Sequence, residues 1–183
     1  MCPHPNPPSL TGEGECHERP LSLMPKSRAK SHPFEPEFVE LIRAMFEERI
    51  VFNRVLGLRI TSFDPQRAQA RIEMREELIG HFVHQRLHGG VISATLDAMG
   101  GFAVMLAIGS RHLDEEVEAR LMRFAKLGTI DMRVDYLRPA VGPHFVATAQ
   151  AIRLGSRVAT TRMELHDSED RLVSTGTAAY MVS

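Results

Sequence analysis

A carboxylate in an otherwise apolar segment is the first candidate for chemistry in this chain. Asp97 lies within HGGVISATLDAMGGFAV, residues 88–104, where nearly every other side chain is small or apolar. A lone buried carboxylate is costly unless something uses it. Gly89 and Gly90 open the segment, where close approach to backbone N–H groups lets a helix start hold an oxyanion. With Asp97 as general base or nucleophile, these groups predict acyl transfer to water.

The spacing of these groups predicts a site shared between two chains. Nine residues separate His88 from Asp97, which on a helix places them on opposite sides and roughly 13 Å apart along the axis. One helix cannot bring both ends of this segment to the same atom of a small substrate. Two copies that meet antiparallel across a twofold axis can do so twice. We therefore expect a homodimer with two shared sites.

The elements that must position these groups follow from hydrophobic periodicity. The apolar helix over about 90–109 has few charges and must be covered nearly all round. Residues 56–74 indicate two strands joined by a turn at Asp64–Pro65. From residue 129 onward the pattern predicts four strands in a meander. The expected fold class is α+β, with an antiparallel sheet around one long central helix.

Two further helical segments flank this arrangement. Apolar residues at helical spacing predict an amphipathic helix over about 35–53, whose role is packing; they are Phe38, Leu41, Ile42, Met45, Phe46 and Ile50. A short helical insertion is expected at about 111–127, since apolar residues recur there at the same spacing. Residues 34–183 would thus form one domain.

Composition limits the classes of partner. The chain has 183 residues, 43% hydrophobic and 25% charged, with a formal net charge of −1. This balance argues against nucleic acid or an anionic membrane as a partner, and no apolar run approaches the roughly 20 residues that cross a bilayer. Residues 1–33 are rich in proline and predict a disordered tail. The two cysteines, Cys2 and Cys16, lie in that tail, so a reducing, cytoplasmic location is expected.

These residues carry a family resemblance. The run His88-Gly89-Gly90, with an acid nine positions after the histidine, resembles the active-site signature of the hotdog-fold acyl-CoA thioesterases of the phenylacetate-pathway type. The similarity covers roughly residues 55–183 and is closest to bacterial medium- and long-chain acyl-CoA thioesterases. It implies a hotdog fold, an acyl-CoA substrate, no cofactor, and a homodimer that pairs again into a homotetramer.

The resemblance also implies roles for individual residues. Asp97 corresponds to the catalytic acid, and Gly89 to the oxyanion N–H donor, contributed by the partner protomer. Thr129 stands where relatives often place a hydroxyl that positions water. A coenzyme A nucleotide contact is implied for the loop Gly155, Ser156 and Arg157, with assistance from Arg138.

The residues before the histidine depart from the family pattern. Many relatives have an asparagine six or seven positions earlier, where this chain has Phe82 and His81. His81 can supply an equivalent donor. His88 itself has two open interpretations, a direct role or a ring that bonds to backbone and orients the turn.

Apolar residues of the central helix indicate where the acyl chain would bind. An apolar wall formed with the 111–127 insertion would accommodate a medium or long chain; its residues are Phe102, Met105, Leu106 and Ile108. The sequence leaves open whether the acyl group is aliphatic or aromatic. The histidines at 81, 84 and 88 lack the supporting ligands of a zinc site, so no metal is expected. Two alternatives remain, a non-catalytic acyl-CoA-binding hotdog protein and a hotdog hydratase. The opposite faces of His88 and Asp97 count against the hydratase.

Overall fold

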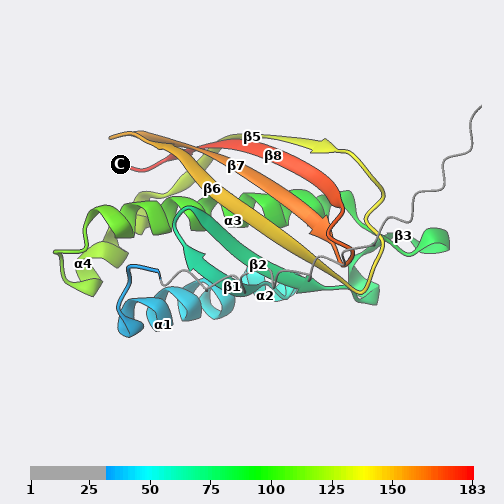
Figure 1. Ribbon diagram of the computed structural model, residues 1–183, viewed down its shortest axis with the longest axis horizontal. Coiled ribbons are helices and arrows are strands. Elements are labelled where there is room, and N and C mark those ends of the chain that lie inside the picture. Colours follow the sequence, from blue (N-terminus) through cyan, green and yellow to red (C-terminus); the bar gives the residue numbers. More distant parts are fainter. Residues whose placement is uncertain (1–31) are drawn as a thin grey trace, which may run out of the picture.

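A six-stranded antiparallel sheet wraps around one long helix in the computed structural model, which describes residues 32–183. The expected tail over 1–33 lies almost entirely outside the described residues. Figure 1 shows the helix α3 (Gly89–Arg111) lying along the concave side of the sheet. The strands are β1 (Arg59–Asp64), β2 (Arg67–Glu73), β5 (Gly128–Tyr136), β6 (His144–Leu154), β7 (Val158–Asp167) and β8 (Leu172–Met181). The expected α+β arrangement is confirmed.

The strand order corrects the predicted meander. Of the four strands predicted to form it, only β6, β7 and β8 are consecutive neighbours in the sheet, whose order is β1-β2-β6-β7-β8-β5. The strand β5 pairs with β8, so the connection after Tyr136 crosses to β6 on the other side of two strands. Alternation of apolar residues identifies a strand but not its neighbour, which is why the sequence missed this crossover. As a result β5 lies at the edge of the described sheet, with its second side unpaired there.

The predicted helix over 35–53 is interrupted. It consists of α1 (Pro36–Ala44), a π-helical turn (Met45–Arg49) and α2 (Val51–Leu56), with Ile50 in extended conformation between the last two. The Ile50 N–H bonds to the Met45 carbonyl, which frees the Phe46 carbonyl. The Asn53 side chain donates to that carbonyl at 2.9 Å. Side-chain hydrogen bonding of this kind is not visible in hydrophobic periodicity.

A buried carboxylate holds the π-helical turn against the sheet. Glu47 is 7% exposed and accepts hydrogen bonds from Arg43, at 3.1 Å, and from Arg59, at 3.0 Å. Its Oε1 also accepts the backbone N–H of Ile60 in β1, at 2.7 Å. Because charged hydrogen bonds are the stronger ones, these contacts keep the interrupted helix in place beside α3.

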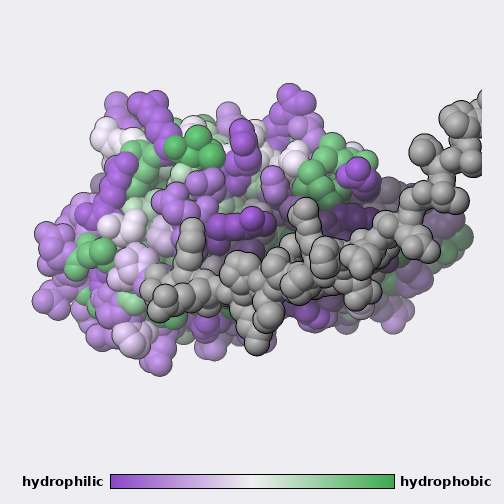
Figure 2. All heavy atoms as spheres, in the orientation of Figure 1, coloured by the Kyte–Doolittle hydropathy of each residue, from purple (hydrophilic) through white to green (hydrophobic). Residues whose placement is uncertain are grey.

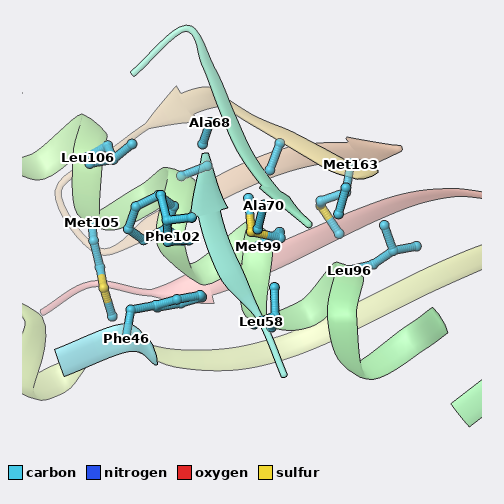
Figure 3. Packing of buried hydrophobic residues seen from close by; sticks show 14 of the residues in the cluster. Phe46, Leu58, Ala68, Ala70, Leu96, Met99, Phe102, Met105, Leu106 and Met163 are labelled. Atoms are coloured by element: carbon cyan, nitrogen blue, oxygen red, sulfur yellow. The ribbon is translucent and has the colours of Figure 1, made fainter. Parts of the chain in front are cut away.

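The core lies between α3 and the inner face of the sheet. Figure 3 shows Leu96, Met99 and Phe102 of α3 among apolar side chains from the strands, including Met163 of β7. By length and composition α3 could cross a membrane, but 61% of its most apolar stretch is buried within the protein. Hydrophilic side chains predominate on the face in Figure 2, and its apolar groups are small and separate. The apolar character of α3 is therefore that of a core helix.

The insertion after α3 contains α4 (Val117–Met122) and a 3₁₀ turn (Arg123–Lys126). Arg120 of α4 is 1% exposed, pairs with Glu35, and lies 4.5 Å from the ring centre of Phe38. Burial lowers the pKa of Arg120, but a guanidinium remains charged at neutral pH. The ion pair and the cation–π contact tie the insertion to the start of α1.

Two short elements precede α3. The strands β3 (Ile79–His81) and β4 (Arg86–Leu87) form a small hairpin of their own. The hairpin projects beyond the end of the main sheet in Figure 1. The Leu87 N–H donates to the Ala140 carbonyl, which fixes the chain just before the start of α3.

Candidate functional site

Asp97 lies partly buried in the middle of α3, where two side chains from the sheet reach it. The Thr129 hydroxyl, near the start of β5, donates to Asp97 Oδ1 at 2.8 Å. The Tyr180 hydroxyl of β8 donates to the Asp97 backbone carbonyl at 2.9 Å and lies 3.3 Å from Oδ1. One carboxylate oxygen is thus oriented by hydroxyl groups, which leaves Oδ2 available to a bound molecule.

Tyr180 is a functional neighbour that sequence reasoning missed. Burial raises the pKa of its hydroxyl, and the Asp97 charge and the hydrogen bond raise it further, so Tyr180 stays protonated and donates. A Cβ at Gly100 would overlap the Tyr180 hydroxyl, which explains why α3 has a glycine there. No local pattern in the sequence indicated this contact, because Tyr180 lies 83 positions from Asp97 and reaches it only through the packing of β8 on α3.

A mostly apolar cleft of about 270 Å³ opens beside the Asp97 carboxylate. One wall is α3, a second is the interrupted N-terminal helix, and the third is the start of β5 with Tyr180. The lining residues are Phe46, Ile50, Phe52, Asn53, Ala94, Asp97, Ala98, Gly101, Met105, Leu127, Gly128, Thr129 and Tyr180. Binding clefts of small ligands commonly combine apolar walls with a few polar groups. A single carboxylate at an apolar cleft is such a combination.

The composition of this cleft corrects the expected apolar wall. Of the four wall residues, only Met105 lines the cleft; Phe102, Leu106 and Ile108 are buried in the core. The N-terminal helix, expected only to pack, supplies lining residues instead. Helical periodicity shows that a helix has an apolar side, but not which neighbour that side will face.

The start of α3 is built around His88. His88 is the N-cap, and its Nδ1 accepts the Gly90 N–H at 2.8 Å, the contact typical of an N-cap side chain. The Gly90 N–H therefore already has an acceptor. Of the two glycines expected to donate an N–H to the substrate, Gly89 is left as the candidate donor. Among residues 32–183 no acceptor is assigned to the Gly89 N–H. The Tyr136 hydroxyl binds the Gly89 carbonyl, at 3.1 Å.

A single chain does not bring Gly89 and Asp97 together. Eight residues of helix separate them, roughly 12 Å along the axis. Each one is nevertheless tied to β5, Asp97 through Thr129 near its start and Gly89 through Tyr136 at its end. The two halves of the candidate site therefore lie at opposite ends of the same edge strand.

The three histidines of the loop do not form a common site with Asp97. His81 and His84 are exposed in the β3–β4 hairpin, with ring centres 4.9 Å apart. The described part of the chain contains no group of three acidic, histidine or cysteine side chains placed to hold a metal. The structure gives His81 no contact with the residues around Asp97.

The two parts of the expected nucleotide contact lie at opposite ends of the sheet. Gly155 and Ser156 form the β6–β7 turn and line a second cavity of about 240 Å³ with Arg111 and Arg123. A Cβ at Gly155 would lie 2.8 Å from the Val158 carbonyl, so this glycine also has a structural role in the turn. Arg157, next in the chain, is exposed.

Arg138, the other residue expected to contact the nucleotide, lies at the opposite end of the sheet. Its Nη1 donates to the Leu172 carbonyl, at 2.8 Å, where β8 begins. The Arg157 carbonyl instead accepts the Val182 N–H beyond the end of β8. Since β8 spans Leu172–Met181, its length, about 30 Å for ten residues, separates the two arginines. One chain cannot present both to the same phosphate group.

Comparisons with known proteins add independent information. Residues 84–174 match the family described as Thioesterase superfamily. The chain is similar to the medium/long-chain acyl-CoA thioesterase YigI of Escherichia coli (strain K12), at 36% identity over 144 residues, 79% of this chain and 93% of that protein. A Shewanella oneidensis crystal structure described as related to the thioesterase superfamily matches with a TM-score of 0.77 and 39% identity, covering 84% of this chain and 100% of that one.

A more distant likeness concerns the fold alone. Thioesterase superfamily member 2 from Mus musculus matches with a TM-score of 0.63 at 20% identity, over 82% of this chain and 100% of that one. Together with the observed sheet and central helix, these likenesses confirm the hotdog fold.

Proposed function

This chain belongs to the thioesterase superfamily and is a thioester hydrolase, and we propose that it hydrolyses medium- and long-chain acyl-CoA to the free acid and coenzyme A. The observation that carries this proposal is the hydroxyl-oriented carboxylate of Asp97 beside a mostly apolar cleft of about 270 Å³. The apolar walls suit an acyl chain, and the carboxylate suits the attack on its thioester carbon.

The proposed reaction needs one group at each side of the carbonyl. Asp97 removes a proton from water as it attacks the carbonyl carbon, or attacks that carbon itself. The carbonyl oxygen, which becomes negative, accepts the Gly89 N–H of the partner subunit. The C–S bond then breaks and the coenzyme A thiolate leaves. Direct attack forms a mixed anhydride between Asp97 and the acyl group, which water then hydrolyses. Oxygen-18 from labelled water enters Asp97 during a single turnover only if water opens this anhydride at the aspartyl carbon, so label found in the protein by mass spectrometry would demonstrate direct attack.

A dimer formed through β5 would complete the site. Antiparallel pairing of two β5 strands about a twofold axis near Met132 would set the Thr129 end of one beside the Tyr136 end of the other. Asp97 would then face Gly89 of the partner subunit. Exposed apolar side chains on and after β5 support this interface, with Ile130 56% and Leu137 50% exposed. We further propose that two such dimers form a tetramer.

Complementation between two inactive variants tests the shared site. Asp97→Asn removes the carboxylate, and Gly89→Pro removes the N–H at a helix position that tolerates proline. If both groups come from different subunits, subunit exchange regenerates one intact site in each mixed dimer, roughly a quarter of the wild-type activity for an equal mixture. A mixture as inactive as its components, with exchange verified by native mass spectrometry, would contradict the shared site.

The coenzyme A nucleotide has a proposed location at the β6–β7 turn. Gly155, Ser156 and Arg157 remain our proposed contacts, and the neighbouring Arg111 adds positive charge. Arg138 can reach the same nucleotide only from another subunit, since it lies at the far end of β8. We also propose a cytoplasmic location. Residues 32–183 contain no cysteine and so form no disulfide, which suits a reducing compartment.

The test of the proposed function is thiol release from acyl-CoA substrates of graded length. Wild type is expected to turn over these substrates, whereas Asp97→Asn should lose at least 100-fold in kcat, the scale of a lost general base. Asp114→Asn, which changes an exposed carboxylate in the insertion, is the matched control and should behave as wild type. Equal rates for wild type and Asp97→Asn would refute the proposal. Binding of acyl-CoA without turnover by wild type would instead indicate the non-catalytic alternative.

A further inference from the structure

Two adjacent glycines of α3 have different surroundings. A Cβ at Gly100 would overlap Tyr180, so packing requires glycine at that position. A Cβ at Gly101 would have Tyr180 at 3.8 Å and Leu127 at 3.9 Å as its nearest neighbours, both ordinary contact distances. Gly101 lines the cleft beside Asp97. Packing therefore leaves room for a side chain at 101, and its absence keeps the cleft open.

Gly101 lies midway in a row that runs along the cleft. Asp97, Gly101 and Met105 follow at intervals of four residues, and so lie above one another on the same side of the helix. All three line the cleft. Figure 3 shows the Met105 side chain pointing toward Phe46 of the π-helical turn. Met105 and Phe46 therefore stand at the end of the row that lies away from the carboxylate.

The opposite wall of the cleft is held in a fixed position. Phe46 belongs to the π-helical turn, in which Glu47 accepts two hydrogen bonds from β1 and a third from Arg43 of α1. Asn53, which is 3% exposed, donates to the Phe46 carbonyl from the next turn. Phe46 also packs on Phe102 of the core, with ring centres 4.7 Å apart. A wall fixed at so many points cannot easily move away to admit a longer ligand.

We propose that Gly101 and Met105 set the length of the acyl chain that the enzyme accepts, with Gly101 as the open floor and Met105 as the stop. This inference rests on the proposed function. Eight residues of helix from Asp97 to Met105 span roughly 12 Å. An extended chain advances about 1.2 Å per bond, since three backbone bonds span about 3.6 Å. The row therefore accommodates roughly ten bonds, which favours medium over long chains.

Two substitutions with opposite effects test the proposal. Gly101→Val fills the floor, so hydrolysis of decanoyl-CoA should fall at least ~10-fold in kcat/KM relative to butyryl-CoA, whose chain ends before the obstruction. Met105→Ala removes the stop, so kcat/KM for palmitoyl-CoA relative to decanoyl-CoA should rise by a similar factor. Gly101→Ala, which the space around 101 admits, should show the first effect in weaker form. Ala107→Val, on the same helix but outside the cleft lining, is the control.

The ratio of rates for two chain lengths separates specificity from damage to the fold. A loss of folded protein lowers the measured rate with every substrate by the same factor, and so leaves the ratio of rates unchanged. One outcome is that wild type and Asp97→Asn differ as expected while Gly101→Val and Met105→Ala keep the wild-type dependence of rate on chain length. That result would refute the role of Gly101 and Met105 in chain-length selection and leave the proposed function standing. If wild type hydrolyses no acyl-CoA of any length, both are refuted. Opposite shifts in the preferred chain length of the two variants would support the proposed chain-length selection.

Discussion

The Thr129 hydroxyl donates a 2.8 Å hydrogen bond to Oδ1 of Asp97, across 32 positions of sequence. This bond joins the start of an edge strand to the middle of the central helix. It holds Oδ1 of a carboxylate that lines the cleft. Any chemistry at Asp97 depends on this orientation, because proton transfer requires aligned groups at hydrogen-bonding distance.

Thr129→Val should lower kcat by roughly 10- to 100-fold while KM changes little. The substitution removes a hydrogen bond to a charged group, worth about 1.5–3 kcal/mol, but keeps a β-branched side chain in the strand. Steady-state thiol release with a saturating acyl-CoA measures the effect. Thr160→Val, on the exposed side of β7, should leave kcat unchanged. Equal kcat for both variants would show that Thr129 has no part in orienting Asp97.

Gly89→Pro should lower kcat about 100- to 1,000-fold, the scale of one lost oxyanion donor. His88 has the extended backbone that a following proline requires, and Gly89 is the first residue of α3. The helix is therefore expected to form normally, which circular dichroism can verify. Gly89→Ala keeps the N–H and should retain most of the activity. Loss of activity in both variants alike would point to crowding near Tyr136 rather than to the N–H.

His88→Ala should destabilise the protein by about 1 kcal/mol, because the Gly90 N–H loses its N-cap acceptor. His88→Asn replaces that acceptor and should recover most of the loss. Urea unfolding of the three proteins measures the difference. A proton-transfer role for His88 would instead make both variants similarly inactive, with stability restored only by asparagine.

Asp167 is expected to make stability depend on acid pH. Burial alone would raise the pKa of its carboxyl, but hydrogen bonds from the Arg171 side chain and from the N–H groups of Arg171 and Glu169 outweigh this and lower the pKa. A carboxylate with a lowered folded-state pKa stabilises the fold above its unfolded pKa, and the stabilisation is lost as pH falls through the folded value. Its contribution should therefore be complete at pH 7 and decline below about pH 4.

Asp167→Asn provides the comparison for this effect. At pH 7 it should be less stable than wild type by roughly 1.5–3 kcal/mol, the range for a hydrogen bond to a charged group. The gap should narrow as pH falls below about 4, because the unfolded wild-type chain then takes up a proton at Asp167 that the folded protein does not bind until lower pH. Urea unfolding at pH 7, 5 and 3.5 follows the gap. A gap of the same size at all three values would contradict the assignment.

Local residue types made much of the site predictable. Asp97 drew attention because a carboxylate is rare in so apolar a helix, and Gly89 because it opens that helix. Thr129 followed from the family resemblance, and its hydrogen bond to Asp97 is consistent with that prediction. By contrast Tyr180 and the N-terminal wall of the cleft were missed, since each meets Asp97 only through packing between segments distant in sequence.

The sequence by itself determined the elements and the chemical groups of this protein, because a strand repeats every two residues, a helix every 3.6, and each residue carries its own reactive atoms. Only the tertiary structure decided the neighbours. It placed β5 beside β8 rather than β6, and turned Phe46 and Met105 toward one cleft. Such pairings depend on the burial and hydrogen bonds of the whole fold, and a local sequence pattern does not show which distant segments will meet.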